Sequence, residues 1–242
     1  MKIDLSGKTA LVTGSTSGIG HAVATRLAAA GANVVVNGRA QAKVDASVAK
    51  LAAEISTSKV RGIAADVSTA AGCKALTDAL PEVDILINNA GIFWAKPIVD
   101  TTEEEYDRMF AVNAKGQFFA LQEAAKHMAD GGRIVNISTG GTKLAFPGIS
   151  IYGASKSALE FFTKVAAKEL GAKHITVNTV SPGYTETDML SDPQFRTIGV
   201  QASPLGRLGT PADIAQVVSF VVSDEAGWIT GDTIQAGGGV VM

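Results

Sequence analysis

Short apolar runs alternate with helical patterns along almost the whole chain, and this alternation limits the fold more than any other feature. Runs typical of buried strands cover 8–13, 33–37, 59–65, 83–87, 132–138, 175–180 and 233–236. Helical patterns separate most of them, at 23–30, 42–55, 69–80, 101–128, 157–170 and 211–223. This order predicts a mostly parallel α/β sheet with helices on both faces. No linker or low-complexity stretch divides it, so we expect a single domain over residues 1–242.

The composition narrows the class of protein. Of 242 residues, 46% are hydrophobic and 18% are charged, which is typical of a compact globular chain. The net charge is −2 without any basic block, so nucleic acid is not an expected partner. No run approaches the ~18 uninterrupted apolar residues that read as a membrane span, and the N-terminus lacks the apolar core of a signal peptide. We therefore expect no membrane association.

Cysteine and histidine usage adds two expectations. Cys73 is the only cysteine, which excludes an intrachain disulfide and favours a reducing, cytoplasmic location. His21, His127 and His174 are far apart and have no companions at ligand spacing. The sequence therefore predicts no metal site.

A glycine-rich turn follows the first apolar run. Small residues there let the backbone approach a pyrophosphate, and the N-terminus of the next helix offers free N–H groups. The spacing is not G-x-G-x-x-G, and a plain tight turn would also use such glycines. We interpret the turn as a dinucleotide cradle, made of Gly14, Ser15, Thr16, Ser17, Gly18, Ile19 and Gly20.

The second apolar run ends in Gly38 and Arg39. An acidic residue here would bind the ribose 2′-hydroxyl of NAD, and none is present. Gly38 leaves space, and the guanidinium of Arg39 is a fixed fork of donors suited to a phosphate. These residues favour NADP over NAD, although Arg39 could also be a solvated surface residue.

Polar residues follow the third and fourth runs. The Asp66 carboxylate, before Val67, can accept from an adenine amino group or cap the next helix with Ser68. The fourth run ends in Asn88-Asn89-Ala90-Gly91. Its amides can brace a crowded strand end and its small residues let a cofactor lie close, although a simple turn would also explain them.

Asn113 falls in the middle of the longest helical pattern. An asparagine there has a poor helix propensity and tends to disturb local hydrogen bonding. It is either a tolerated surface residue or the sign of a helix break that frees a carbonyl.

Tyr152 and Lys156 lie four residues apart, on one face of a predicted helix. The unperturbed tyrosine pKa is about 10. An ammonium at about 4 Å, in an effective dielectric of about 20, would favour the phenolate by about 4 kcal/mol. It would thus lower the tyrosine pKa by up to about 3 units. Such a pair can shuttle a proton near pH 7, although the short pattern alone also fits an ordinary helix start.

Nearly all of these residues lie at the carboxyl ends of predicted strands, where ligands bind in such sheets. Together they resemble the short-chain dehydrogenase/reductase family over essentially the whole chain. The resemblance implies a single Rossmann-type, doubly wound domain, a nicotinamide cofactor and hydride exchange with a carbonyl or alcohol. The matching motifs are Thr13-Gly14-x-x-x-Gly18-Ile19-Gly20, Asp66-Val67, Asn88-Asn89-Ala90-Gly91, Asn113, Tyr152-x-x-x-Lys156 and Pro182-Gly183.

The resemblance also implies roles. Tyr152 would be the acid/base, and Lys156 would hold the nicotinamide ribose and lower the Tyr152 pKa. Asn113 would position a water for a proton relay, and a hydroxyl after the fifth strand would steady the substrate oxygen. Further cofactor contacts are expected from Asp66, Val67, Asn89, Ala90, Gly91, Pro182, Gly183, Thr185 and Thr187.

The chain departs from the family at two places. The family serine usually stands thirteen residues before the tyrosine, and here that position holds Thr139, with Ser138 one earlier. Either hydroxyl could serve, and the spacing slightly favours Thr139. The tail reads Ala236-Gly237-Gly238 instead of Asp-Gly-Gly, which puts the usual terminal subunit contacts in doubt.

The family resemblance also predicts a substrate lid at about 184–206. Apolar residues of this segment and of two other loops predict a partly apolar pocket: Met189, Leu190, Phe195, Ile198, Val200, Phe93, Trp94, Leu144 and Phe146, with Arg196 among them. The most similar subgroup is that of the β-ketoacyl-acyl carrier protein reductases and their sugar- and steroid-oxidising relatives. This similarity does not assign a substrate.

Three functions compete. The first is an NADP(H)-dependent reductase or dehydrogenase; the others are a non-catalytic dinucleotide sensor or structural protein, and an epimerase or dehydratase. The chain keeps both Tyr152 and Lys156, and its length leaves little room for a substrate domain, so the first is favoured. The long helices before Gly131 and after Tyr152 predict a homotetramer like that of the family.

Overall fold

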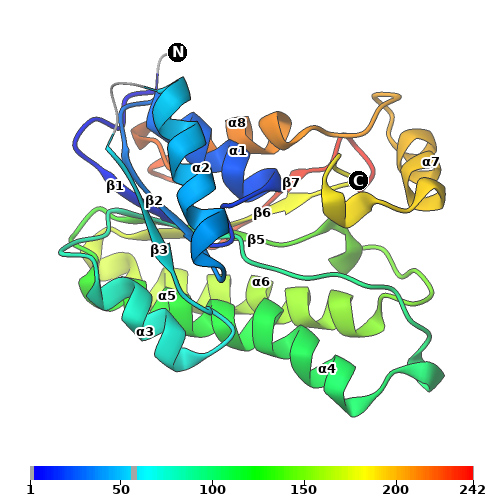
Figure 1. Ribbon diagram of the computed structural model, residues 1–242. Helices are drawn as coiled ribbons and strands as arrows, with labels where there is room; N and C mark the ends of the chain where they lie inside the picture. The colour runs from blue at the N-terminus through cyan, green and yellow to red at the C-terminus, as the bar shows by residue number, and fades with distance from the viewer. Residues whose placement is uncertain (1–2, 56–58, 242) are drawn as a thin grey trace.

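The computed structural model describes residues 3–55 and 59–241 (Figure 1). Within them one sheet has the strand order β3-β2-β1-β4-β5-β6-β7, and every neighbouring pair of strands is parallel. This confirms the predicted parallel α/β fold. The strands are β1 Thr9–Val12, β2 Asn33–Gly38, β3 Val60–Ala64, β4 Ile85–Asn88, β5 Arg133–Ile137, β6 Thr176–Pro182 and β7 Thr233–Ala236.

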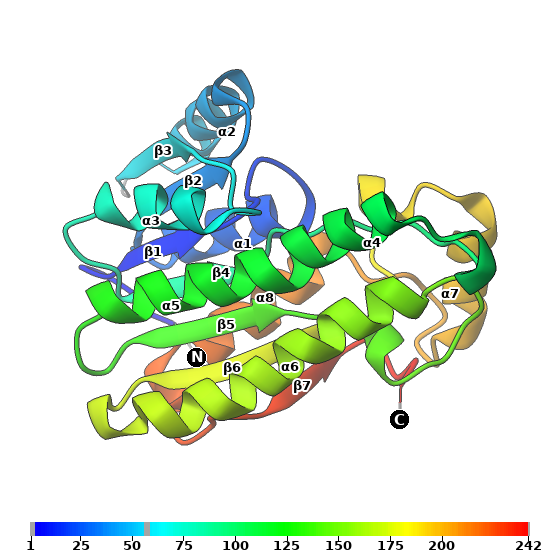
Figure 2. The same cartoon turned by 90° about the horizontal axis from the view of Figure 1, so that it is seen from below.

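Helices cover both faces of the sheet. On one face lie α1 Gly18–Ala29, α2 Gln41–Glu54 and α8 Pro211–Val221, and on the other lie α3 Ala70–Asp78, α5 Gln117–His127 and α6 Ser150–Leu170. Figure 2 shows the second layer from outside, with α4 Glu103–Phe110 continuing the line of α5 beyond the sheet. The first helix begins five residues earlier than its alanine-rich pattern, directly at Gly18 of the glycine-rich turn.

Each face of the sheet has its own apolar core. Along β1, Ala10 and Val12 pack with the α1 and α8 side, whereas Leu11 packs with the α3, α5 and α6 side. Successive strand residues point to opposite faces. Because both faces are buried under helices, both sets must be apolar, which explains the continuous apolar runs of the sequence.

The strand order places a crevice at one end of the sheet. β1 has β2 on one side and β4 on the other, so the chain crosses over between them. Ligands of such sheets bind outside the carboxyl ends of the strands at this switch point. The segment after β6 lies at the same end, together with the C-terminus (Figure 1).

A helix that the sequence pattern did not predict occurs in the expected lid. α7 spans Pro193–Ala202. It begins with Asp192 as N-cap, whose carboxylate accepts from the Gln194 N–H at 2.7 Å, and with Pro193 in its first turn. Both residues are favoured at these positions.

Two further observations concern membranes and metals. Across residues 3–55 and 59–241, no helix combines the length and the apolar character that a bilayer crossing needs. In the same part of the chain, no three His, Cys, Asp or Glu side chains cluster in a way that could hold a metal ion.

Candidate active site

A pocket opens at the carboxyl ends of β4, β5 and β6. Its walls come from the loops after these strands, from the start of α6, from the segment before and within α7, and from the C-terminal tail. Most of its surface is apolar, provided by Ile92, Phe93, Leu144, Phe146, Ile149, Met189, Leu190, Phe195 and Val240. Tyr152 and Thr139 bring hydroxyl groups into this apolar surface.

The first turns of α6 carry Tyr152 and Lys156 to one side of the pocket, as the four-residue spacing predicts. Lys156 is 3% exposed, and its Nζ donates to the carbonyl oxygen of Ile137, at the end of β5, at 2.7 Å. Tyr152 shares a hydrogen bond with the Thr139 side chain. The Phe93 ring meets the Tyr152 ring edge-on, with centroids 4.8 Å apart, which fixes the phenol in the pocket wall.

Burial dominates the protonation of both groups. It raises the pKa of Tyr152 above its ordinary value, and the hydrogen bond from Thr139 opposes this rise. Burial also lowers the pKa of Lys156 to about 7. The prediction that Lys156 lowers the pKa of Tyr152 is therefore wrong for this structure, because burial favours the neutral form of each group. The phenol is protonated at neutral pH and can act as an acid.

The low pKa of Lys156 makes stability depend on pH. The lysine pKa in the unfolded chain is about 10.4. Between pH 7 and that value the unfolded state binds more protons, so stability rises with pH, whereas below pH 7 the burial penalty is fully present. Lys156→Met removes the buried amine, so we expect its free energy of unfolding to exceed that of the native chain by the largest amount at pH 7. This difference should shrink as the pH rises. Urea unfolding at several pH values measures it.

Lys168→Met provides the control, because Lys168 is exposed on the same helix. As a substitution on the exposed surface, it should change the free energy of unfolding by no more than about 0.5 kcal/mol. A difference between native chain and Lys156→Met that is constant from pH 7 to pH 9 would contradict the buried, weakly basic amine.

The two hydroxyls after β5 point to different partners. Thr139 contacts Tyr152, whereas Ser138 Oγ donates to the Glu160 carboxylate at 2.8 Å and is 4% exposed. Both residues line the pocket. The geometry therefore favours Thr139 over Ser138 as the hydroxyl beside the Tyr152 oxygen.

Asn113 lies within a π-helical turn, Ala111–Gly116, between α4 and α5. It is fully buried, so the surface alternative is wrong. The helix does not end at Asn113 but widens to a π-turn there, and the freed carbonyl stays a prediction. The Asn113 Oδ1 accepts from the Ile92 N–H and its Nδ2 donates to the Ile92 carbonyl oxygen, both at 2.9 Å. π-turns are frequent at functional sites, and this one fixes the loop after β4 against the pocket.

Gly91, the last residue of the Asn-Asn-Ala-Gly segment, lies close to both Asn113 and Lys156. A Cβ at Gly91 would lie 3.4 Å from Asn113 Oδ1 and 3.4 Å from Lys156 Nζ. The Asn-Asn-Ala-Gly segment, Asn113 and Lys156 thus meet in one small volume. A larger side chain at position 91 would displace one of these two polar groups.

The glycine-rich turn packs directly on the loop after β4. Gly14 has φ +61°, and a Cβ there would lie 2.8 Å from the Ala90 Cα. Asn89 Nδ2 donates to the carbonyl oxygens of Thr13 and Gly14 at 3.0 and 3.1 Å. The amides brace this crowded strand end as predicted, and the close approach requires glycine at position 14.

The other side chains of the turn hold it to β2. Ser15 is fully buried, donates to the Val12 carbonyl oxygen at 2.7 Å and accepts from the Asn37 N–H at 3.0 Å. The Thr16 Cγ2 lies 2.7 Å from where a Gly38 Cβ would stand, so Gly38 leaves the space that Thr16 fills. Arg39, directly after Gly38, therefore lies beside the turn and is exposed.

The N-terminus of α1 fits an anion. Ser17, its N-cap, makes no side-chain capping bond, and the first turn contains no acidic residue. Its free N–H groups and the positive end of the helix dipole suit a pyrophosphate. Gly18 has φ +55°, and the Thr187 Cγ2 lies 3.5 Å from the position of its missing Cβ. Thr187 thus meets the cradle, and Ile19 lines the pocket beside it.

Asp66 precedes α3 but is not its N-cap, and its contact with adenine stays a prediction. Its Oδ1 accepts from the Ser68 N–H at 3.0 Å, and this bond, with the nearby Arg39 charge, holds the pKa of Asp66 below its ordinary value. The N-cap of α3 is Thr69, whose hydroxyl accepts from the Gly72 N–H at 3.0 Å. Asp66 is exposed beside the cradle, and Val67 packs in the core.

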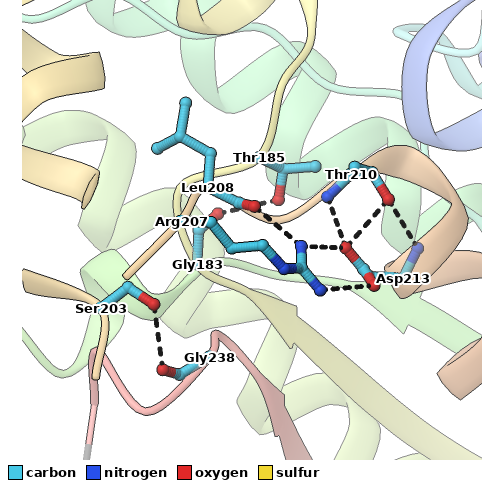
Figure 3. Close-up of polar contacts among 8 residues, drawn as sticks. All are labelled: Gly183, Thr185, Ser203, Arg207, Leu208, Thr210, Asp213 and Gly238. Atoms are coloured by element: carbon cyan, nitrogen blue, oxygen red, sulfur yellow. Dashed lines mark hydrogen bonds and ion pairs between the residues drawn. The ribbon is translucent and has the colours of Figure 1, made fainter. Parts of the chain in front are cut away.

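The C-terminal end of the expected lid is held by two groups of hydrogen bonds. Arg207 makes two contacts with the Asp213 carboxylate, at 2.7 and 3.0 Å, and Asp213 accepts from the Thr210 N–H at 2.7 Å, which completes a capping box on α8 (Figure 3). The Ser203 hydroxyl donates to the Gly238 carbonyl oxygen at 3.2 Å. These bonds tie the segment after α7 to α8 and to the C-terminal tail.

The tail itself enters the site. A Cβ at Gly183, which with Pro182 lines the pocket after β6, would lie 2.8 Å from the Gly237 Cα. The glycines of the unusual tail therefore allow the two chain segments to cross closely. Thr185 is buried nearby, and its hydroxyl donates to the Gly183 carbonyl oxygen at 3.1 Å (Figure 3).

The predicted apolar pocket is present, with some differences in its members. Trp94 does not line it; instead the Arg108 guanidinium carbon lies 5.9 Å from the Trp94 ring centroid. Ile198 and Val200 of α7 also lie outside the lining, and Arg196 pairs with Glu186 at 2.8 Å. Sequence reasoning missed Val240 of the tail, and it missed Glu160, whose signal was a charged residue four positions after Lys156 within an apolar run.

Comparison with known proteins identifies the family. A family profile described as enoyl-(acyl carrier protein) reductase matches residues 14–241. The chain is 40% identical to a probable tetrahydroxynaphthalene reductase of Zymoseptoria tritici, over 98% of this chain and 96% of the relative. It is 42% identical to an uncharacterised oxidoreductase of Methylorubrum extorquens, over 98% of each chain. The chain belongs to the short-chain dehydrogenase/reductase family.

A solved member of this family has the same fold. The crystal structure of the angucycline C-6 ketoreductase LanV with bound NADP superposes with a TM-score of 0.92 at 40% identity, covering 98% of this chain and 96% of LanV. The protein is thus an oxidoreductase of the short-chain dehydrogenase/reductase family with a Rossmann-type domain.

Proposed function

We propose that this protein is an NADPH-dependent reductase of ketones or aldehydes, acting in reverse on the corresponding alcohols, with Tyr152 as its acid/base. The observation that carries the proposal is the position of the Tyr152 phenol in the wall of an apolar pocket that Lys156 and Thr139 also line. Bound nicotinamide supplies or accepts the hydride in this chemistry. The raised pKa of Tyr152 favours donation of its proton to a carbonyl oxygen, which suits reduction.

The neighbouring groups assist Tyr152. Thr139, already hydrogen-bonded to Tyr152, can steady the substrate oxygen with its hydroxyl. Because the pKa of Lys156 is about 7, its amine is present in both the protonated and the neutral form near neutral pH. It can hydrogen-bond to a ribose hydroxyl and supply a proton. Asn113 holds the loop at Ile92 and would position a water for proton relay.

NADP is the cofactor that the cradle fits best. The uncapped N-terminus of α1 suits a pyrophosphate, and Arg39 suits a 2′-phosphate where NAD enzymes carry an acid. LanV, at 40% identity, was solved with NADP bound. The residues that would hold it are Gly14, Ser15, Thr16, Ser17, Gly18, Ile19, Gly20, Arg39, Asp66, Val67, Asn89, Ala90, Gly91, Tyr152, Lys156, Pro182, Gly183, Thr185 and Thr187.

The pocket favours uncharged, flat substrates. Phe93 stands between the Tyr152 ring and the Phe195 ring of α7, with a centroid distance of 6.2 Å to the latter. Aromatic walls of this kind suit planar rings. Two similar proteins are named for action on fused-ring compounds, an angucycline ketoreductase and a probable tetrahydroxynaphthalene reductase. We infer that segment 184–206 closes over a cyclic or aromatic ketone.

Oxidation of NADPH and NADH across a carbonyl panel tests the proposal. The panel contains cyclic and aromatic ketones, diketones, β-ketoacyl thioesters, sugars and steroids. We expect NADPH consumption to exceed NADH consumption, and fused-ring ketones to react faster than thioesters or sugars. Tight NADPH binding without turnover on any member would instead favour a non-catalytic dinucleotide sensor.

The expected homotetramer is also a proposal. Phe118 of α5 and Phe161 and Val165 of α6 are exposed large apolar side chains, with Phe161 65% exposed. Both helices belong to the layer that Figure 2 shows from outside. A second copy of the chain packing on this face would bury them. Light scattering after size exclusion should give four copies, and a monomer would contradict the assembly. The cytoplasmic location stays a prediction.

A further inference from the structure

Glu160 is a buried carboxylate that the proposed chemistry does not use. It is 7% exposed and lies on α6, one turn after Lys156 and two turns after Tyr152, on the same face of the helix. A buried carboxylate costs free energy unless hydrogen bonds compensate it. Its partners therefore indicate what it does.

All three polar partners of Glu160 come from the segment that follows β5. Glu160 Oε1 accepts from Ser138 Oγ at 2.8 Å and from Thr142 Oγ1 at 2.7 Å, and Glu160 Oε2 lies 3.6 Å from Lys143 Nζ. Bonds to an ionised carboxylate are shorter and stronger than bonds between neutral groups. One side chain of α6 thus holds both ends of segment 138–142.

Thr139 lies between the two anchored hydroxyls. Its side chain contacts Tyr152, while its Oγ1 also accepts from the Gly141 N–H at 3.2 Å. Its carbonyl oxygen lies 3.1 Å from the Thr142 hydroxyl. Because Ser138 and Thr142 both turn toward Glu160, the residue between them is held in the orientation that meets Tyr152.

We propose that Glu160 is a positioning residue, whose buried carboxylate fixes segment 138–142 so that the Thr139 hydroxyl stays against the Tyr152 oxygen. This inference rests on the proposed function. Lys156 makes the adjoining contact, from its Nζ to the Ile137 carbonyl oxygen at 2.7 Å. Successive turns of α6 therefore carry Tyr152 as the acid, Lys156, which bonds to the end of β5, and Glu160, which bonds to segment 138–142.

Glu160→Ala is expected to lower kcat about 10-fold, because small misplacements of a catalytic group are costly. The KM for NADPH should change less than twofold, because Glu160 contacts no part of the cradle. Glu160→Gln should recover most of the loss, since its carbonyl oxygen can still accept from both hydroxyls. Unchanged kcat in Glu160→Ala, or equal losses in both variants, would overturn the proposal.

A double-variant cycle separates positioning from general damage. If Glu160 acts through Thr139, the variant carrying both Thr139→Ala and Glu160→Ala should lose no more kcat than Thr139→Ala alone. The Thr139 hydrogen bond lowers the pKa of Tyr152. Thr139→Ala removes this bond and Glu160→Ala is expected to misplace it, so in each single variant the part of the kcat–pH profile that reports Tyr152 ionisation should move to higher pH. Losses that multiply, or a pH profile that does not move, would contradict it.

Controls keep the test decisive. Glu169→Ala removes an exposed carboxylate from the same helix and should leave kcat and the pH profile unchanged. If Glu160→Ala does not fold, Thr142→Val removes one donor and should lower kcat with the same shift of the limb; native behaviour would overturn the proposal. Turnover that survives Tyr152→Phe would end the proposed function, whereas an inactive Tyr152→Phe with a fully active Glu160→Ala would end only this inference.

Discussion

Tyr152→Phe is expected to lose turnover while it still binds NADPH. The substitution removes only the phenolic oxygen and keeps the ring that packs edge-on against Phe93 at 4.8 Å. Proton transfer by a positioned side chain contributes about 10²–10⁴-fold to rate, and kcat should fall by this factor. The kcat on a ketone and the Kd for NADPH, measured on the same preparation, check the two halves of the expectation.

The other tyrosines provide matched controls. Tyr106 is 46% exposed and stacks on Phe110 away from the pocket, so Tyr106→Phe should leave kcat unchanged. Tyr184 lines the pocket, and burial raises its pKa, so it is the alternative acid. A loss of turnover in Tyr184→Phe together with less than a tenfold loss in Tyr152→Phe would assign the acid to Tyr184.

The fold could be predicted from the sequence because its determinants are local and repeated. Each apolar run is long enough for a strand buried on both faces, and the helices between the strands have apolar stripes. Their alternation fixes a parallel sheet and hence the common edge where the loops after β1, β4 and β5 meet. The helix α7 was not predicted, because its apolar residues show only a weak helical periodicity. The only sequence signal for it is its N-terminal cap, Asp192 followed by Pro193.

Parts of the site could also be predicted, and others not. A disturbance of the helix at Asn113 could be predicted from a residue type that fits an α-helix poorly, and the structure has a π-turn there in place of a break. The spacing of Tyr152 and Lys156 gave their shared location but not their pKa values. Those depend on how much protein surrounds each group, and this is decided by loops distant in sequence. Glu160 was missed for the same reason, since its partners lie about twenty residues away along the chain.

Arg39→Asp is expected to reverse the cofactor preference. Arg39 is exposed directly after β2, beside the glycine-rich turn, where an acid would bind the ribose hydroxyls of NAD. The variant should raise the Kd for NADPH about 100-fold, because a hydrogen bond to a charged group is worth about 1.5–3 kcal/mol and the new carboxylate also repels the phosphate. The Kd for NADH should fall. Fluorescence titration of the purified variant with both dinucleotides measures the two changes.

Lys59→Asp separates a local contact from a change of net charge. Lys59 is exposed directly before β3, at the amino ends of the strands and thus at the opposite end of the sheet from the cradle, and the substitution alters the charge by the same amount. It should change the Kd for NADPH less than twofold, because screening weakens interactions between exposed charges that lie beyond about 10 Å. Equal losses in both variants would mean that the field of the whole protein, not Arg39, attracts the phosphate. Unchanged NADPH affinity in Arg39→Asp would show that Arg39 does not touch it.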